Sequence, residues 1–187
     1  DNIPLQENYK TNIFGNLISS STDFNVTIDD SWAPYEYNFD DLEQISTGVI
    51  YDPNQKTFFL DGVSGLQWYA EQSNGVTKSA VVHDRVNQSV DKGNLTVFGG
   101  QTVVLTSDVD LQGVAWTPIG KNNTIAGTFD GGDHVISNLT VTGTEKSVGL
   151  FASTGRGMTI KNVRMNNVNI EGSDYAGAIV GKGLCAR

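Results

Sequence analysis

The second half of the chain repeats a short pattern of alternating apolar residues, and this repeat restricts the possible folds more than any other feature. SDVDL at 107–111, SNLTV at 137–141 and KNVRM at 161–165 share one alternation, at steps of 30 and then 24 residues. VGLFAS at 148–153 and AGAIVG at 176–181 form a second pair, 28 residues apart. Irregular steps between similar strands indicate loops of variable length that project from regularly stacked units.

One such unit cannot bury its apolar face alone, so successive units must stack, with equivalent strands paired about 4.8 Å apart. We expect Asp108, Asn138 and Asn162 to occupy equivalent places in three coils. Asparagine tolerates the left-handed backbone of a sharp corner, and equivalent Asn side chains there could hydrogen-bond in a ladder. The repeat therefore predicts a mainly β protein built as a solenoid. A small β-sandwich is the alternative that also uses short strands.

Composition and charge agree with short strands and exclude several classes of protein. The chain has 21 glycines, 4 prolines and a net charge of −9, all of which comes from the acidic residues 1–61. No basic stripe is present for a nucleic-acid backbone, and no apolar run is long enough to span a membrane. The single cysteine, Cys185, forms no internal disulfide and supplies no metal cluster. We therefore expect no nucleic-acid partner, membrane span, metal or cofactor.

The first half of the chain is less regular. Residues 1–48 are predicted to form a β-rich tail and an acidic linker, and residues 49–187 a partial solenoid. At 49–60 two apolar runs flank Asp-Pro-Asn-Gln, which predicts a hairpin. Ser64 is expected to cap a short helix over 65–73, and a second helix is expected over 79–90. We expect no helix after Gly93.

A resemblance to a known family rests on several of these segments together. WTPIGKNNTIAGTFDGGDHVISNLTV at 116–141, followed by VGLFAS, IKNVRMNNVNIEG and AGAIVG, resembles the repeat of bacterial surface proteins that carry GLUG-type motifs. TVVLTSDVDL at 102–111 and GLQWYAEQSNG resemble the strand and helix that precede it, so the resemblance covers about 62–187. It implies a right-handed parallel β-helix with an adhesin-like role at the cell surface, and it carries over no catalytic residues.

A second resemblance concerns the N-terminal segment. Residues 3–29 are similar to the closing segment of fimbrillin-like domains in Bacteroidetes surface lipoproteins. Together the two resemblances imply part of a larger extracellular, outer-membrane-associated protein, whose signal sequence lies outside these residues. An open solenoid end exposes unpaired edge groups, so we expect either a continuation of the polypeptide beyond Arg187 or a partner.

Four carboxylates are the candidates for catalysis, because β-helices also serve as polysaccharide lyases and glycoside hydrolases. Asp108 and Asp110 share one strand face, and Asp130 and Asp133 lie beside His134. Hydrolysis needs two carboxylates at a fixed separation, and calcium needs several oxygen ligands. Turn chemistry, in which Asp side chains bond to their own backbone, is the simpler interpretation. We therefore assign no catalytic and no metal residue.

Aromatic side chains are the better candidates for sugar binding, because flat rings stack on pyranose faces. Trp32, Tyr35 and Tyr37 form an acidic aromatic cluster and are the binding residues we predict. Trp68 and Trp116 are expected to plug the solenoid core instead. The loops 121–126, 142–147 and 171–175 are the candidate contact regions.

Three functions remain open on the sequence alone. The first is a non-catalytic, adhesin-like binding or stalk module, whose partner would be a glycan or an extracellular protein. The second is a polysaccharide lyase or glycoside hydrolase on the same scaffold, since function belongs to sites rather than folds. The third is a spacer that holds an upstream module away from the envelope.

Overall fold

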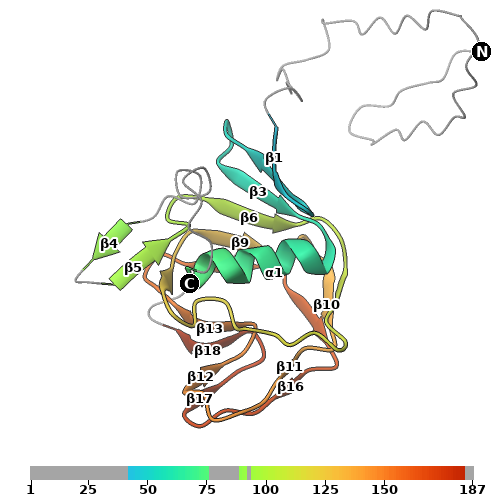
Figure 1. Ribbon diagram of the computed structural model, residues 1–187, viewed down its shortest axis with the longest axis vertical. Helices are drawn as coiled ribbons and strands as arrows, with labels where there is room; N and C mark the ends of the chain where they lie inside the picture. The colour runs from blue at the N-terminus through green and yellow to red at the C-terminus, as the bar shows by residue number, and fades with distance from the viewer. Residues whose placement is uncertain (1–41, 76–88, 92–93, 184–187) are drawn as a thin grey trace, which may run out of the picture. The chain divides into compact units, whose positions relative to one another are not determined.

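The computed structural model describes residues 42–75, 89–91 and 94–183, and the predicted mainly β fold is confirmed there, with one helix (Figure 1). The chain divides into two compact units, Asp1–Tyr37 and Asn38–Arg187. All described residues belong to the second unit. No described helix is long and apolar enough to cross a membrane.

The predicted hairpin at 49–60 is confirmed. β2 (Val49–Asp52) and β3 (Thr57–Leu60) pair antiparallel, and β1 (Glu43–Ser46) adds a third strand beside β2. The Asp52 carboxylate accepts hydrogen bonds from the backbone N–H groups of Asn54 and Gln55, at 2.9 and 3.1 Å. The turn is therefore stabilised by its own first side chain, as Asx-turn chemistry predicts.

The helix predicted over 65–73 is present but begins earlier. α1 (Gly62–Ser73) follows Asp61, so the prediction that Ser64 caps the helix was wrong. Capping is supplied from outside the helix, because the Ser107 hydroxyl accepts the N–H of Gly62 at 2.9 Å. No local sequence pattern announces a cap that is 45 residues away along the sequence. Leu66 and Tyr69 on the inner face of α1 are fully buried.

The second predicted helix, over 79–90, was wrong at its end. Ser89 and Val90 belong to β4 (Ser89–Asp91), which pairs antiparallel with β5 (Asn94–Val97). A valine recurring every four residues suits alternate positions of a strand as well as a helix face. Residues 79–88 lie outside the described part of the chain. From 94 to 183 the structure contains strands and turns without a helix, as expected.

The later strands form three layers, which we define as residues 102–125, 128–154 and 159–183. The first layer contains β6 (Thr102–Leu105), β7 (Val109–Asp110) and β8 (Thr124–Ile125). The second contains β9 (Thr128–Asp130), β10 (Val135–Ser137), β11 (Thr140–Val141), β12 (Ser147–Val148) and β13 (Phe151–Thr154). The third contains β14 (Thr159–Lys161), β15 (Arg164–Asn166), β16 (Asn169–Ile170), β17 (Tyr175–Ala176) and β18 (Val180–Gly183).

Strand pairs between these layers are parallel. β6 pairs with β9 and β9 with β14, while β7 pairs with β10 and β10 with β15. Each remaining strand of the second layer from β11 to β13 pairs with its counterpart from β16 to β18. Inward-pointing residues consequently align, as in Val109, Ile136 and Met165. These aligned residues form the ladders that bury the interior.

The predicted alignment of Asp108, Asn138 and Asn162 was wrong. The register pairs Val109 with Ile136 and Ile136 with Met165, which places Asn138 beside Asn167 rather than Asn162. Asn138 and Asn167 are each in the left-handed conformation, with φ of 59° and 50°. Each is an extra corner residue between two strands, so counting alternation across it shifts the register.

The second predicted alignment, of 148–153 with 176–181, is confirmed at its start. Val148 pairs with Ala176, but Phe151 pairs with Val180, one residue beyond the predicted partner. The register therefore slips by one residue between β12 and β13.

The stack is closed at its N-terminal side by a different kind of unit. β3 and β5 pair parallel with β6 and β8 of the first layer, and α1 lies in the sequence between them. Tyr69 of α1 packs edge-on against Phe98 and stacks with Phe129, at centroid distances of 4.7 and 5.8 Å. α1 therefore fills the interior next to the first layer (Figure 1).

Candidate binding surface

The predicted aromatic candidates Trp32, Tyr35 and Tyr37 lie outside the described residues. Trp68 and Trp116 were expected to fill the core, and this is confirmed, since 7% and 8% of their surfaces are exposed. The Trp116 indole N–H donates to the carbonyl of Leu150 at 3.3 Å. Each of these two rings is thus primarily part of the packing.

The three predicted contact loops lie side by side along one side of the stack. The Lys121 ammonium lies 2.9 Å from the Glu145 carboxylate, which links the first loop to the second. The backbone N–H of Ser173 donates to the Glu145 carbonyl at 3.1 Å, which links the second to the third. We call residues 121–126, 142–147 and 171–175 together the loop face.

The first of these loops is fixed to the end of α1. The Asn74 side-chain oxygen accepts the N–H groups of Lys121 and Asn122, at 2.8 and 3.2 Å. Its amide donates to the carbonyl of Pro118 at 3.0 Å. A residue that is 7% exposed and makes three bonds at a helix end holds the loop in one conformation. The loop face is therefore preorganised where it meets the helix.

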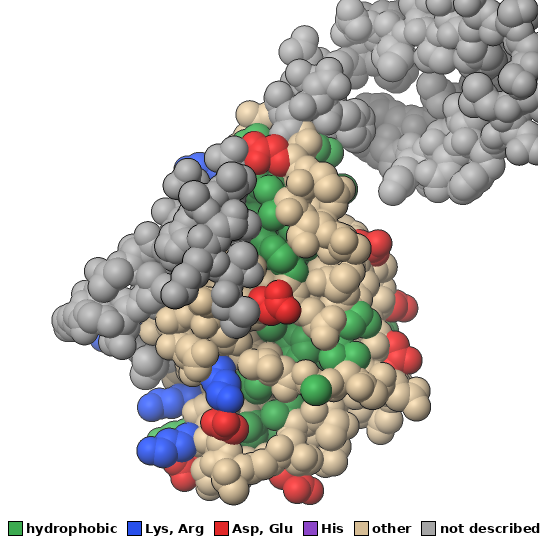
Figure 2. All heavy atoms as spheres, in the orientation of Figure 1, with side chains coloured by type: hydrophobic (Ala, Val, Ile, Leu, Met, Phe, Trp, Pro, Cys, Tyr) green, Lys and Arg blue, Asp and Glu red, His purple; other side chains and the backbone are tan. Residues whose placement is uncertain are grey.

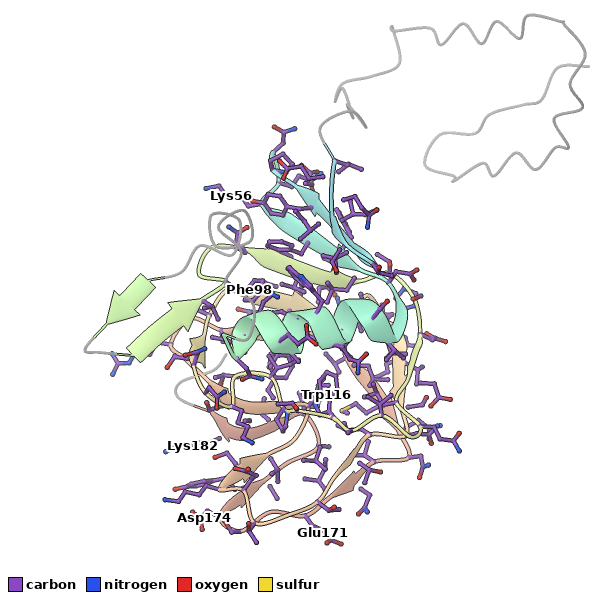
Figure 3. The ribbon with its side chains drawn as sticks, viewed as in Figure 1. Lys56, Phe98, Trp116, Glu171, Asp174 and Lys182 are labelled. Carbon is purple, nitrogen blue, oxygen red and sulfur yellow. The ribbon has the colours of Figure 1, made fainter. Side chains whose placement is uncertain are left out.

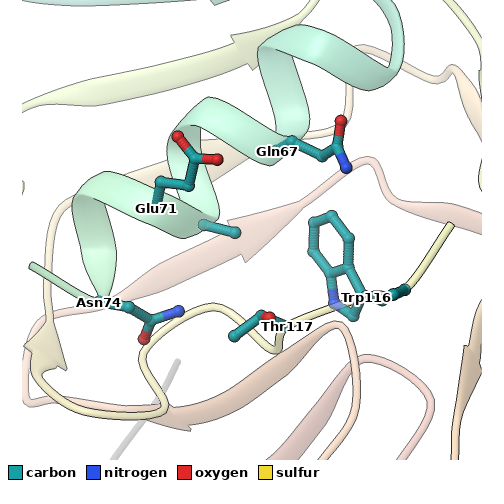
Figure 4. Close-up of a pocket in the computed structure, with 7 residues that line it drawn as sticks. Gln67, Glu71, Asn74, Trp116 and Thr117 are labelled. Atoms are coloured by element: carbon teal, nitrogen blue, oxygen red, sulfur yellow. The ribbon is translucent and has the colours of Figure 1, made fainter. Parts of the chain in front are cut away.

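A small pocket opens between α1 and the segment leading into this loop (Figure 4). It has a volume of about 130 Å³ and is lined by Gln67, Ala70, Glu71, Asn74, Ala115, Trp116 and Thr117. The lining combines one indole ring with amide, carboxylate and hydroxyl groups. Small-ligand sites are lined by such a mixture of apolar surface and a few polar groups, and their volumes are usually about 300–1,000 Å³, so this pocket would take only part of a ligand.

A second, more open hollow is lined in part by the same segment. Its volume is about 610 Å³, and its walls run from Leu111 to Thr117 and from Thr140 to Thr142. Ala115, Trp116 and Thr117 border both hollows. The segment 115–117 therefore contributes to both hollows, and Thr142 of the loop face also lines the second one.

Tyr175 is an exposed aromatic residue of the loop face that the sequence reasoning did not single out. Its surface is 47% exposed, and the Lys182 ammonium lies 5.2 Å from its ring centroid. Figure 3 shows Lys182, Asp174 and Glu171 projecting outward from the third layer. Basic and acidic side chains are interspersed near β12, β17 and β18 in Figure 2. The sequence signal for this residue was an aromatic side chain within a loop that was predicted to be polar.

Two of the four candidate carboxylates hold neighbouring layers together. The Asn138 amide donates to Asp110 at 2.7 Å, and the Asn167 amide donates to Asn138 at 2.5 Å. The expected corner ladder is thus present, with Asp110, Asn138 and Asn167 as its members. The Asn138 amide is the main reason why the pKa of Asp110 is lowered. For Asp108, the N–H of Val135 is the main cause of a lowered pKa, with His134 3.3 Å away as a lesser one.

The other two carboxylates belong to the predicted turn at 130–133. Asp130 accepts the N–H of Gly132 at 3.0 Å, which confirms the turn chemistry, and it also contacts Lys161 at 2.9 Å and Asn162 at 2.9 Å. Partial burial raises its pKa, but these partners together lower it further than burial raises it. Asp133 contacts Arg164 at 3.2 Å. Each carboxylate is therefore engaged within its own turn or with the adjacent layer.

No group of three or more His, Cys, Asp or Glu side chains suited to a metal occurs within the residues that the structure describes.

Comparison with known proteins found no matching family model, no matching curated protein and no matching solved structure.

Proposed function

We propose that this protein is a non-catalytic, adhesin-like binding module of an extracellular surface protein, built as a right-handed parallel β-helix with GLUG-type repeats. The parallel, in-register pairing of three successive layers supports this architecture, because each apolar ladder is continued by the next layer. A scaffold of this kind presents loops of unequal length along one side. The upstream fimbrillin-like segment belongs to the same proposal.

The gathering of three loops beside the Trp116 pocket is the observation that carries the proposed binding role. Loop positions on a rigid scaffold are where binding residues concentrate. The loop face offers an exposed Tyr175 ring, and the pocket adds Gln67, Glu71 and Thr117 around an indole. Rings combined with amide and carboxylate groups suit a carbohydrate, which has apolar ring faces and polar hydroxyls. The ligand we propose is therefore an extracellular glycan.

The engagement of the carboxylates favours binding over hydrolysis. An acid–base pair needs two carboxyl groups facing one substrate bond. Asp110 and Asp130 instead accept hydrogen bonds from neighbouring asparagines, and Asp108 from a backbone N–H. These contacts join neighbouring layers. Removing them is therefore expected to lower the stability of the fold and not to abolish a catalytic activity.

The test is a glycan array probed with the purified protein, with retention and released product measured together. We expect retention of particular glycans without released oligosaccharide, and about two- to tenfold weaker binding for Tyr175→Ala, since an aromatic contact contributes about 0.5–1.5 kcal/mol. Ile50→Ala is the matched control, because Ile50 is exposed to a similar degree (38%) but lies in β2. Released product would instead support the hydrolase or lyase alternative, and an unchanged affinity in Tyr175→Ala would remove the loop face from the site.

A further inference from the structure

The third layer is less covered than the layers before it. Along one ladder, Val109 and Ile136 are 1% and 0% exposed, whereas Met165 is half-buried. Along another, Val103 and Phe129 are fully buried, whereas Ile160 is half-buried. The same holds for Val163, Val168, Ile170, Ile179 and Val180. The apolar residues of the third layer are therefore covered by the second layer on one side. On the other side they meet no described strand.

Backbone groups of this layer point to the same open side. The N–H groups of Asn169 and Glu171 donate to Leu139 and Val141 of the second layer, at 2.8 Å each. Because a parallel strand bonds to one neighbour through alternate residues, the N–H of Ile170 between them faces away from the second layer. By the same argument Ala176 faces away, since Tyr175 and Gly177 donate to Lys146 and Val148.

The corner ladder also has a direction. Each asparagine donates its amide to the preceding layer, from Asn138 to Asp110 and from Asn167 to Asn138. Asn167 is the last member among the described residues, and its side-chain oxygen is placed as the next acceptor. A following layer would thus repeat the amide-to-oxygen hydrogen bond that already joins the first layer to the second and the second to the third.

The opposite end of the stack is closed. The edge of β3 is covered by β2, and β5 is paired with β4, in both cases antiparallel. A head-to-tail contact between two copies would need an open parallel edge at this end, which the hairpins occupy. A symmetric tail-to-tail contact would make facing strands antiparallel, so the parallel register of the ladders would end there. Neither arrangement of two copies continues the ladders.

We infer that the third layer is a docking surface for one further β layer of the same repeat, stacked parallel and in register. This partner has aliphatic residues opposite Ile160, Met165 and Ile170, and an asparagine whose amide donates to Asn167. Its backbone carbonyls accept the N–H groups of Ile170 and Ala176. Such a layer would extend the layer-to-layer interfaces of the structure, and its docking does not depend on the proposed glycan ligand.

The experiment supplies such a layer to the protein of residues 1–187. A tandem variant carries a second copy of residues 155–183 inserted after Gly183, and amide hydrogen exchange is followed residue by residue by NMR. In the unmodified protein we expect Ile170 and Ala176 to exchange rapidly and Asn169 and Glu171 slowly. In the tandem variant we expect exchange at the original Ile170 and Ala176 to slow by at least about tenfold.

A matched tandem variant, in which the residues copied from Ile160 and Met165 are both replaced by Asp, is expected to give no added protection. Fast exchange at Ile170 and Ala176 in the first tandem variant, with slow exchange retained at Asn169 and Glu171, would overturn the inference. Slow exchange at Ile170 and Ala176 in the unmodified protein, accompanied by a dimeric mass in light scattering, would also overturn it, because a second copy would then be the occupant.

Discussion

The two ends of the layered stack use opposite solutions for the same problem. At the N-terminal side, α1 fills the interior and the hairpins β1–β2–β3 and β4–β5 turn the strand edges back on themselves. At the third layer, the parallel strands pair with the second layer only, their outer edges have no described partner, and their inner residues are half-buried. Helices and antiparallel hairpins close a parallel stack. They cover or pair the backbone N–H and C=O groups of the edge strand and leave no further strand edge for parallel pairing.

Position in the stack decides how much a residue contributes to stability, even where the register makes two residues equivalent. Phe129 and Ile160 are register partners, yet only Phe129 is fully enclosed, with Tyr69 and Phe151 against it. Stability in such an array is approximately a sum over layers and their interfaces. Substitutions at paired positions can therefore measure how unequal the two ends are.

Truncating one ladder at two successive positions should change the stability of the protein most. Phe129→Ala should lower the free energy of unfolding by about 3–5 kcal/mol, because a fully buried ring leaves a cavity. Ile160→Ala, one layer further along, should cost about 1–2 kcal/mol, since part of that side chain is already in water. Urea denaturation followed by circular dichroism measures both. Equal costs would mean that the third layer is as well covered as the second.

Two glycines with similar backbone angles provide the next test. Gly127 and Gly157 have φ of 83° and 80°, but a Cβ at Gly127 would lie 2.2 Å from the Phe98 carbonyl oxygen, while nothing lies within 4 Å at Gly157. Gly127→Ala should cost about 2–4 kcal/mol from overpacking and strain together, and Gly157→Ala about 1 kcal/mol from strain alone. Thermal unfolding of the two variants compares them directly. Similar losses would show that backbone strain alone governs these two positions.

Substitutions in the corner ladder should show a smaller difference in stability between the layers. Asn138→Gly keeps the left-handed backbone but loses hydrogen bonds on both sides, for an expected cost of about 1–2 kcal/mol. Asn167→Gly loses only the bond to Asn138 on a more exposed corner and should cost about 0.5 kcal/mol. Chemical denaturation can resolve this difference if both variants are measured in parallel. A larger loss at Asn167 would contradict the direction of the ladder.

The smallest expected effect is in the pH dependence of stability. The pKa of Asp110 is lowered in the folded protein, chiefly by the Asn138 amide, so its carboxylate stabilises the fold at neutral pH. This contribution is present above the ordinary pKa of an aspartate and is lost as the pH falls through the folded-state value. Asp110→Asn should therefore lose less stability than the unmodified protein between pH 7 and pH 3. Asp174→Asn, in the loop face, is the control, and a similar change in both variants would argue against the ladder.

Elements stabilised by local chemistry were predictable from the sequence. The hairpin at 49–60 follows from an Asp-Pro-Asn-Gln turn whose Asp52 side chain bonds to its own backbone. The parallel register was harder, because Asn138 and Asn167 insert corner residues that have no counterpart in the alternation of polar and apolar residues. The start of α1 depends on Ser107, which only folding brings to the helix.

The candidate site was predictable in part, for the same reason. Polar loops at 121–126, 142–147 and 171–175 are visible as interruptions between strands, and the layers bring them together. The pocket beside Trp116 was not visible, because its other wall is Gln67 and Glu71 of α1. A contact between segments so far apart in the sequence is created by packing and has no signal within either segment.

The hydrogen bonds between the layers also determine how this protein responds to mechanical load. They run along the stack, parallel to a force that draws the third layer away from α1. Such a force therefore breaks them one after another instead of all at once. The least covered layer should then peel away first, and its residues 159–183, once extended, would span about 80 Å. Under a pulling force, such a layer would be released first and would lengthen the protein before the N-terminal hairpins open.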